Sequence, residues 1–157
     1  MRKCVFAGTF DPPTLGHKET IAQCLQLFDR VVVAVMVNPN KKPCFSTRER
    51  KEMLRLTIGD EPRVRIIEFR GTVAELMEKE NTKIYVRGIR NATDLDYENA
   101  DLYASHKLDK DLLAVYLPCR QELLHVSSSI VRNSLQFHTP IEEYVTPQVK
   151  EYIENLQ

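Results

Sequence analysis

The segment AGTFDPPTLGHKET, residues 7–20, follows a short apolar stretch and contains two prolines and two glycines. This composition suits neither a strand nor a helix, so we expect a shaped loop between the two. The apolar residues before the loop predict a buried strand at 3–7. After it, the spacing of Ile21, Cys24 and Leu25 predicts one face of a helix. Loops between a strand and a helix often carry binding and catalytic residues.

The rest of the chain alternates apolar runs typical of strands with segments typical of amphipathic helices. Further strands are predicted at 31–37, 64–69, 83–87 and 112–117. Further helices are predicted from Thr47 to about Ile58, around 73–77, at 94–106, from Ser127 to Leu135, and after the Thr146-Pro147 pair. The β-branched strands indicate a parallel sheet covered on both faces. We therefore expect an α/β fold, a Rossmann-like, doubly wound sheet of about five parallel strands with helices on both faces. Residues 1–157 should form this single domain.

Charge and composition exclude several classes of partner. Basic and acidic residues number 22 each, so the formal net charge is zero and any anion binding must come from local placement. The longest apolar run, at 31–37, is far too short to span a membrane. The first residues lack the apolar stretch of a signal peptide, so we expect a cytoplasmic protein without nucleic-acid or membrane partners. The four cysteines form no C-x-x-C pair, so we expect free thiols and no zinc site.

The junctions that follow the predicted strands are the places to look for a site, because ligands of parallel sheets bind beyond the carboxyl ends of the strands. These junctions are 8–17, 38–45, 70–73, 87–94 and 118–129. They carry hydroxyl, imidazole and cationic side chains: Thr9, His17, Lys41, Lys42, Arg87, Arg90 and Ser127 to Ser129. Such groups, together with helix N-termini at one edge of the sheet, favour a polyphosphate ligand.

The first junction is not one of the common phosphate loops, since G-x-x-x-x-G-K-[ST] and G-x-G-x-x-G are both absent. Gly8 would let a ligand approach the backbone, and Thr9 offers a hydroxyl and an amide beside it. Gly16 and His17 lie at the predicted helix start, where free N–H groups attract anions. His17 can donate a hydrogen bond to a phosphate oxygen as charge builds on it. A lone Gly-His pair would indicate only a helix-capping turn with a surface histidine.

The whole string G-T-F-D-P-P-T-x-G-H resembles the [HT]-x-G-H signature of the nucleotidyltransferase superfamily, with Thr14 in the first position. In this form it is similar to the bacterial phosphopantetheine adenylyltransferase family. Three further segments are similar to blocks of that family in order and spacing: NPNKKPCFS (38–46), VRGIRNATDLDYE (86–98) and HVSSSIVRN (125–133). The resemblance therefore covers nearly the whole chain. Departures such as Leu15, where members often have Asn, fall on no position given a catalytic role.

This resemblance implies an enzyme that transfers the adenylyl group of ATP to 4′-phosphopantetheine, giving dephospho-CoA and pyrophosphate. That reaction is the penultimate step of coenzyme A synthesis. It also implies dephospho-CoA and CoA as product-like ligands, Mg²⁺ carried with ATP instead of a protein-held metal, and a homohexamer. The phosphate of phosphopantetheine should attack the α-phosphorus of ATP in line. This nucleophile is already an anion, so no general base is needed.

The resemblance further implies roles for individual residues. His17 would be the catalytic residue, stabilising the transition state at the α-phosphate. Thr9, Lys41 and Arg87 would bind phosphopantetheine, with Val73 along its arm. The ATP site would comprise Thr9, Phe10, His17, Gly88, Ile89, Arg90, Glu98, Leu123, Leu124, His125, Val126, Ser127, Ser128 and Ser129.

Some alternatives stay open on the sequence. Lys42 could replace Lys41, or both could be solvated; Ser127 to Ser129 could be only a helix cap, and Glu98 only a salt-bridge partner. The protein could instead be another nucleotidyltransferase acting on nicotinamide mononucleotide or glycerol phosphate, for which H-x-G-H would be expected. A non-catalytic nucleotide-binding module that keeps the fold is the alternative from a different functional class.

Overall fold

Five strands form one parallel sheet in the order β3-β2-β1-β4-β5, in a computed structural model that describes residues 1–157. The strands are β1 (Lys3–Gly8), β2 (Arg30–Met36), β3 (Val64–Phe69), β4 (Ile84–Ile89) and β5 (Leu113–Pro118). The predicted parallel sheet is confirmed. β4 runs two residues beyond Arg87, where the predicted strand ended, because Gly88 and Ile89 still pair with β5.

Six α-helices connect or follow the strands, close to their predicted positions. They are α1 (Leu15–Leu27), α2 (Thr47–Ile58), α3 (Val73–Glu80), α4 (Ala92–His106), α5 (Ser128–Gln136) and α6 (Pro147–Leu156), with a short 3₁₀ helix, η1, at Gln121–Leu123. Each α-helix starts after a Ser, Thr or Asn whose side chain accepts a hydrogen bond from a backbone N–H of the first turn. These caps explain why the helices begin where they do. The η1 helix was not predicted, since three residues carry no periodic pattern.

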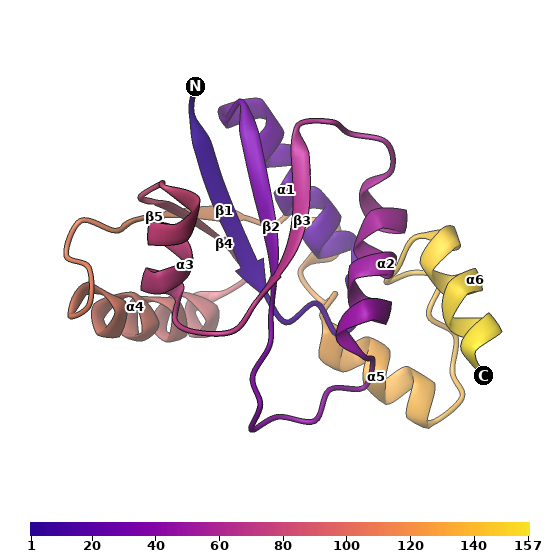
Figure 1. Cartoon of the computed structure of the whole chain (residues 1–157). Helices are drawn as coiled ribbons and strands as arrows, with labels where there is room; N and C mark the ends of the chain where they lie inside the picture. Colours follow the sequence, from indigo (N-terminus) through magenta and orange to yellow (C-terminus); the bar gives the residue numbers. More distant parts are fainter.

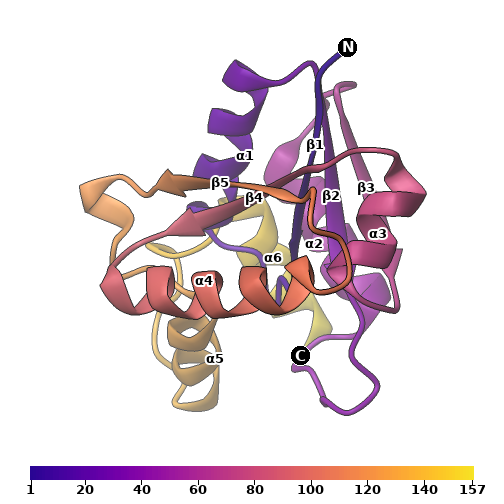
Figure 2. The same ribbon diagram turned by 90° about the vertical axis from the view of Figure 1, so that its left-hand side faces the viewer.

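Alternate residues of the strands face two different helical layers. Cys4, Phe6 and the odd-numbered valines of β2 pack with Ile21 of α1 and Leu54 of α2. Their neighbours along the strands pack with Leu76 and Met77 of α3 on the other face. Figures 1 and 2 show α3 and α4 on one side of the sheet and α2 and α6 on the other. A third apolar cluster joins α2, α5 and α6, so the last two helices are anchored through α2 and not on the sheet.

The sheet divides between β1 and β4. β1 pairs with β2 over its full length of six residues, but with β4 only through Val5 to Tyr85 and Phe6 to Val86. Figure 2 shows β4 and β5 turned away from the direction of the other three strands. The strand order also reverses here: β2 and β3 lie on one side of β1, whereas β4 and β5 lie on the other side. Such a switch point opens a crevice at the carboxyl ends of the strands.

All four cysteines are free thiols, with Cys4 and Cys24 buried, Cys44 exposed and Cys119 between these extremes. None of the helices combines the length and apolarity of a membrane-spanning segment.

Candidate functional site

A cavity of about 380 Å³ lies at the switch point between β1 and β4. Its walls come from the end of β1, the β1–α1 loop, the end of β4, the start of α4 and the start of α5. Most of the residues assigned to the site from the sequence line it: Thr9, Phe10, His17, Arg87, Gly88, Arg90, Glu98, Val126, Ser127, Ser128 and Ser129. Segments that are far apart in the sequence are therefore brought to one place by the strand order.

Six predicted site residues do not line this cavity. Lys41 is exposed on the β2–α2 loop, as is Lys42. Val73 begins α3 and packs with the apolar cluster beside β2 and β3. Ile89 ends β4, and the remaining three lie in or just after η1: Leu123, Leu124 and His125. The ligand contacts predicted for these six residues therefore remain predictions.

The loop before His17 fixes the orientation of its ring, and its surroundings decide its protonation. Its Nδ1 accepts a hydrogen bond from the backbone N–H of Thr14 at 3.0 Å, and its own N–H donates to Thr14 Oγ1 at 3.4 Å. Burial, reinforced by the positive charges of Arg87 and Arg90, lowers the pKa of His17 to about 4. At neutral pH the imidazole is therefore uncharged, with its proton on Nε2 as a hydrogen-bond donor.

The backbone of Thr9 and Phe10 offers further donors to the cavity. Neither amide has an acceptor within the chain, although both residues line the cavity. Phe10 has φ of 52°, a left-handed conformation that is uncommon for a residue with a bulky side chain. Its buried ring lies edge-on to the imidazole of His17, with 4.8 Å between the ring centres.

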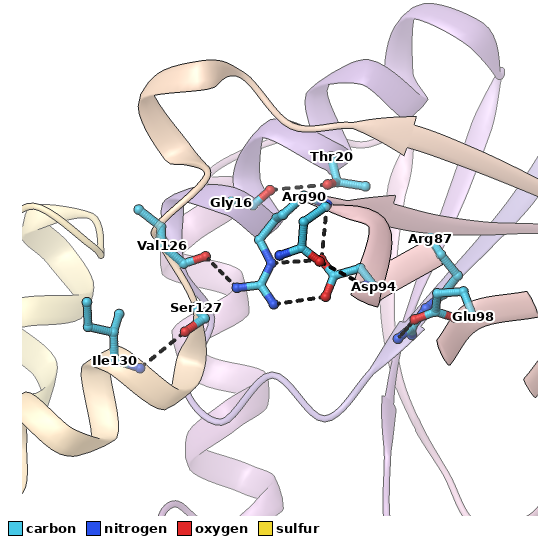
Figure 3. Close-up of polar contacts among 10 residues, drawn as sticks. Gly16, Thr20, Arg87, Arg90, Asp94, Glu98, Val126, Ser127 and Ile130 are labelled. Carbon is cyan, nitrogen blue, oxygen red and sulfur yellow. Dashed lines mark hydrogen bonds and ion pairs between the residues drawn. The ribbon is translucent and has the colours of Figure 1, made fainter. Parts of the chain in front are cut away.

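Two glycines make room for side chains of the protein itself. A Cβ on Gly8 would lie 3.3 Å from the ring of Phe10, so this ring occupies the space that the sequence had suggested for a ligand. A Cβ on Gly88 would lie 2.9 Å from Thr20 Oγ1, closer than side chains tolerate. That hydroxyl donates to the carbonyl of Gly16 at 3.2 Å in the first turn of α1 (Figure 3). Gly88 therefore lets the end of β4 pack against the helix that carries His17.

Arg87 lines the cavity and is hydrogen-bonded to two other groups of the protein. Its guanidinium donates to the carbonyl oxygen of Ala7 in β1 and to Glu98 Oε1 at 2.7 Å (Figure 3). Glu98 is buried and lies on α4, so the ion pair ties α4 to the ends of both β1 and β4. The sequence left open whether Glu98 was only a salt-bridge partner; it is one, and it lines the cavity as well.

Arg90 is held by a second carboxylate of the same helix. Its Nε and Nη2 donate to the two oxygens of Asp94 at 2.9 and 3.2 Å, in the forked geometry that Figure 3 shows. Burial would raise the pKa of Asp94, but the hydrogen bonds from Arg90 outweigh it and lower that pKa overall. The other nitrogen, Nη1, donates to the carbonyl of Val126 at 3.4 Å. Asp94 and Glu98 are one helical turn apart, so one face of α4 aims both arginines.

The N-terminus of α5 forms the opposite wall. Ser127 is the N-cap, and its hydroxyl accepts from the N–H of Ile130 at 3.2 Å (Figure 3). The capping role left open on the sequence is therefore real, while Ser128 and Ser129 also line the cavity, at the helix terminus where backbone amides are free. Backbone amides, a neutral imidazole donor and paired arginines around one cavity suit phosphate groups. Both carboxylates of the cavity, Asp94 and Glu98, are engaged by these arginines.

Comparison with known proteins agrees with this chemistry. Residues 5–134 match the cytidylyltransferase-like family model. A phosphopantetheine adenylyltransferase of Flavobacterium johnsoniae is 39% identical over 150 residues, which cover 96% of this chain and 98% of that protein. One from Thermotoga neapolitana is 37% identical over 145 residues, covering 92% of this chain and 90% of that protein. The chain belongs to the phosphopantetheine adenylyltransferase family.

The resemblance inferred from the four sequence motifs is thereby confirmed, as is membership of a nucleotidyltransferase family. A solved structure from Vibrio parahaemolyticus, named as a candidate nicotinate-nucleotide adenylyltransferase, shares the fold with a TM-score of 0.73. It is 24% identical, and the match covers 99% of this chain and 93% of that one. At this identity the likeness concerns the fold alone, and it supports the Rossmann-like architecture of the family.

Several cavity residues of this family member were not assigned from its sequence. Asp94 and Arg132 both lie inside motifs that the sequence had singled out, four residues before Glu98 and three after Ser129. A carboxylate one turn from Glu98 was therefore a usable signal. Arg132 Nη1 donates to the carbonyl of Asp11 at 2.8 Å, a contact across the fold for which the sequence offers no signal. Thr20, Tyr97 and Cys119 also line the cavity.

Proposed function

We propose that this chain transfers the adenylyl group of ATP to 4′-phosphopantetheine, forming dephospho-CoA and pyrophosphate in the penultimate step of coenzyme A synthesis. The observation that carries the proposal is the pair of arginines beside a neutral imidazole: Arg87 and Arg90 line one cavity with His17. Two cationic groups suit a reaction that brings two phosphorylated substrates together. The names of the curated relatives point to the same reaction.

The proposed chemistry needs positioning and charge stabilisation only. The phosphate of phosphopantetheine attacks the α-phosphorus of ATP in line, the new P–O bond forms as the bond to pyrophosphate breaks, and no covalent enzyme intermediate arises. His17 donates its Nε2–H to an oxygen of the α-phosphate as negative charge accumulates there. The amides of Thr9 and Phe10 and the N-terminus of α5 supply further donors to the phosphates.

The arginines divide between the substrates in this proposal. Arg87 holds the phosphate of phosphopantetheine, assisted by Lys41 from the exposed β2–α2 loop and with Val73 along the arm. Arg90 and α5 hold ATP. Glu98 and Asp94 keep the two guanidinium groups in place. Because both carboxylates are engaged in this way, ATP brings its own Mg²⁺ and the ion keeps most of its waters.

We further propose that the protein works in the cytoplasm as a homohexamer and that CoA, like dephospho-CoA, binds the same cavity as a product-like ligand. Light scattering of the purified protein measures the assembly directly, and a hexamer would have six times the chain mass of 18.2 kDa.

The proposed reaction is tested by measuring pyrophosphate release from MgATP with each acceptor in turn, and by identifying dephospho-CoA by mass spectrometry. We expect release with 4′-phosphopantetheine and none with nicotinamide mononucleotide or glycerol phosphate. Release with nicotinamide mononucleotide alone would reassign the substrate. ATP binding without release for any acceptor would indicate a nucleotide-binding module instead of an enzyme.

A further inference from the structure

Arg50 is a buried cation that the proposed reaction does not use. It lies in the first turn of α2 with only 3% of its surface exposed. Two of its hydrogen bonds are local: Nε donates to the carbonyl of Ser46 at 3.4 Å, and Nη2 to Thr47 Oγ1 at 3.0 Å. Burial lowers the pKa of Arg50, while the negative charges of Asp11 and Glu68 oppose that shift. A guanidinium buried this far requires partners for its hydrogen bonds.

The third hydrogen bond of Arg50 leaves its own helix. Nη1 donates to the carbonyl oxygen of Thr9 at 2.9 Å, across 41 positions of sequence. A residue that only capped α2 would need no such contact. The bond holds the Thr9 carbonyl toward α2, at the point where β1 gives way to the loop before α1.

The same two segments are joined in the opposite sense by Asp11. Its carboxylate accepts from the backbone N–H groups of Cys44 and Phe45 at 2.8 and 2.9 Å, immediately before the N-cap of α2. A cation from α2 thus binds a carbonyl of the β1–α1 loop, and an anion of that loop binds two amides at the start of α2. The two segments are fixed to each other as one unit.

Phe10 lies between these anchors at Thr9 and Asp11. Its left-handed backbone, with φ of 52°, needs surrounding structure to maintain it. The amides of Thr9 and Phe10 have no acceptor in the chain, and the ring of Phe10 contacts the imidazole of His17. The Thr9 carbonyl and the Phe10 N–H belong to one peptide group. If this peptide turned over, its oxygen would stand where the Phe10 N–H now stands, and a phosphate would be repelled.

We propose that Arg50 is a positioning residue: by holding the Thr9 carbonyl toward α2, it keeps the Thr9–Phe10 amides directed at a bound phosphate and Phe10 against His17. Arg50 touches no substrate and acts through the loop. The inference rests on phosphate binding by this cavity, as in the proposed function, but not on the identity of the acceptor.

The first test is ATP binding without acceptor, followed in the amide resonances of Thr9 and Phe10 on deuterated protein. In the wild type, both resonances should shift as the amides donate to phosphate. In Arg50→Met, which keeps an unbranched apolar side chain but removes the donors, the shifts should be lost and the ATP dissociation constant should rise about tenfold. Arg50→Lys retains one donor and should recover part of both effects.

A matched control separates positioning from stability. Thr57 lies on the same helix, is equally buried, and its hydroxyl bonds only the carbonyl of Met53, at 2.8 Å. Thr57→Val should therefore bind ATP and shift both amides like the wild type, even where its unfolding free energy falls as far as that of Arg50→Met. With phosphopantetheine present, Arg50→Met should turn over about 100-fold more slowly, and Thr57→Val at the wild-type rate.

The outcomes keep the two proposals apart. Absence of turnover in the wild type, with amide shifts that depend on Arg50, would reject the acceptor and support the role of Arg50. The role of Arg50 would be overturned if the wild-type amides of Thr9 and Phe10 did not respond to ATP. It would also be overturned if Arg50→Met or Arg50→Lys left both the shifts and the turnover unchanged. If Arg50→Met does not fold, Arg50→Lys decides: a loss of affinity and turnover without loss of stability relative to Thr57→Val supports positioning.

Discussion

The backbone amide of Thr14 donates a hydrogen bond to Nδ1 of His17 at 3.0 Å. A ring nitrogen that accepts a hydrogen bond carries no proton, so the neutral imidazole keeps its proton on Nε2. The donor is a main-chain group, while the Thr14 hydroxyl caps α1 by accepting from the His17 N–H. Thr14 therefore serves the T-x-G-H motif twice, by starting the helix and by selecting the tautomer that can donate to phosphate.

Replacing His17 by Ala should lower the turnover number by about 100-fold to 1,000-fold, because the transition state loses one positioned donor. ATP should still bind, since Arg90 and the α5 terminus remain. The measurement is steady-state pyrophosphate release, together with ATP titration by calorimetry. His138→Asn is a suitable control, because His138 is exposed and Asn tolerates its φ of 57°. An unchanged turnover number in His17→Ala would remove the imidazole from the mechanism.

The imidazole of His17 should titrate near pH 4 in the free protein, well below the usual 6.5. A lowered pKa means that protonation occurs only in more acidic solution, so His17 stays neutral throughout the range from pH 5 to 8. NMR titration of its ring protons measures the midpoint. Arg87→Gln removes a positive charge that disfavours protonation, so it should raise the midpoint. A wild-type midpoint above pH 6 would contradict the neutral donor.

Arg87→Gln should raise KM for phosphopantetheine by about 10-fold to 100-fold, the effect of losing a charge-assisted hydrogen bond. KM for ATP should change much less, because Arg90 stays paired with Asp94. Arg87→Lys keeps the charge without the fork and should fall between. Arg63→Gln is a matched control, since Arg63 pairs with Glu61 and does not line the cavity. Equal changes in both KM values would show that Arg87 contributes to binding both substrates.

Gly88→Ala should destabilise the protein by about 1–3 kcal/mol, because the added Cβ would lie 2.9 Å from Thr20 Oγ1. Chemical denaturation measures the loss. The double variant Gly88→Ala/Thr20→Ala removes the clashing hydroxyl, so it should be more stable than the sum of the two single changes predicts. Simple additivity would show that the space beside Gly88 is limited by some other group.

The elements of this fold could be predicted because their signals are local. β2 is a run of β-branched residues, and α2 begins at Ser46 with a capping box that the sequence displays directly. The motifs of the site were equally visible, since each lies at the junction that follows a strand. Asp94 and Arg132 were missed within those motifs because their roles come from contacts: one holds Arg90 and the other the carbonyl of Asp11.

By itself, the sequence determined the order of strands and helices along the chain, the nucleotidyltransferase motifs and the residues that could bind phosphate. Helix caps and apolar periodicity act between residues a few positions apart, so a linear sequence displays them. Only the tertiary structure decided that β1 pairs with β4 through two residue pairs, Val5 with Tyr85 and Phe6 with Val86, and then parts from it, which opens the cavity. It also decided the neutral state of His17 and the burial of Arg50 against Thr9. Those properties depend on desolvation and on groups brought together from distant segments, which no spacing along the chain records.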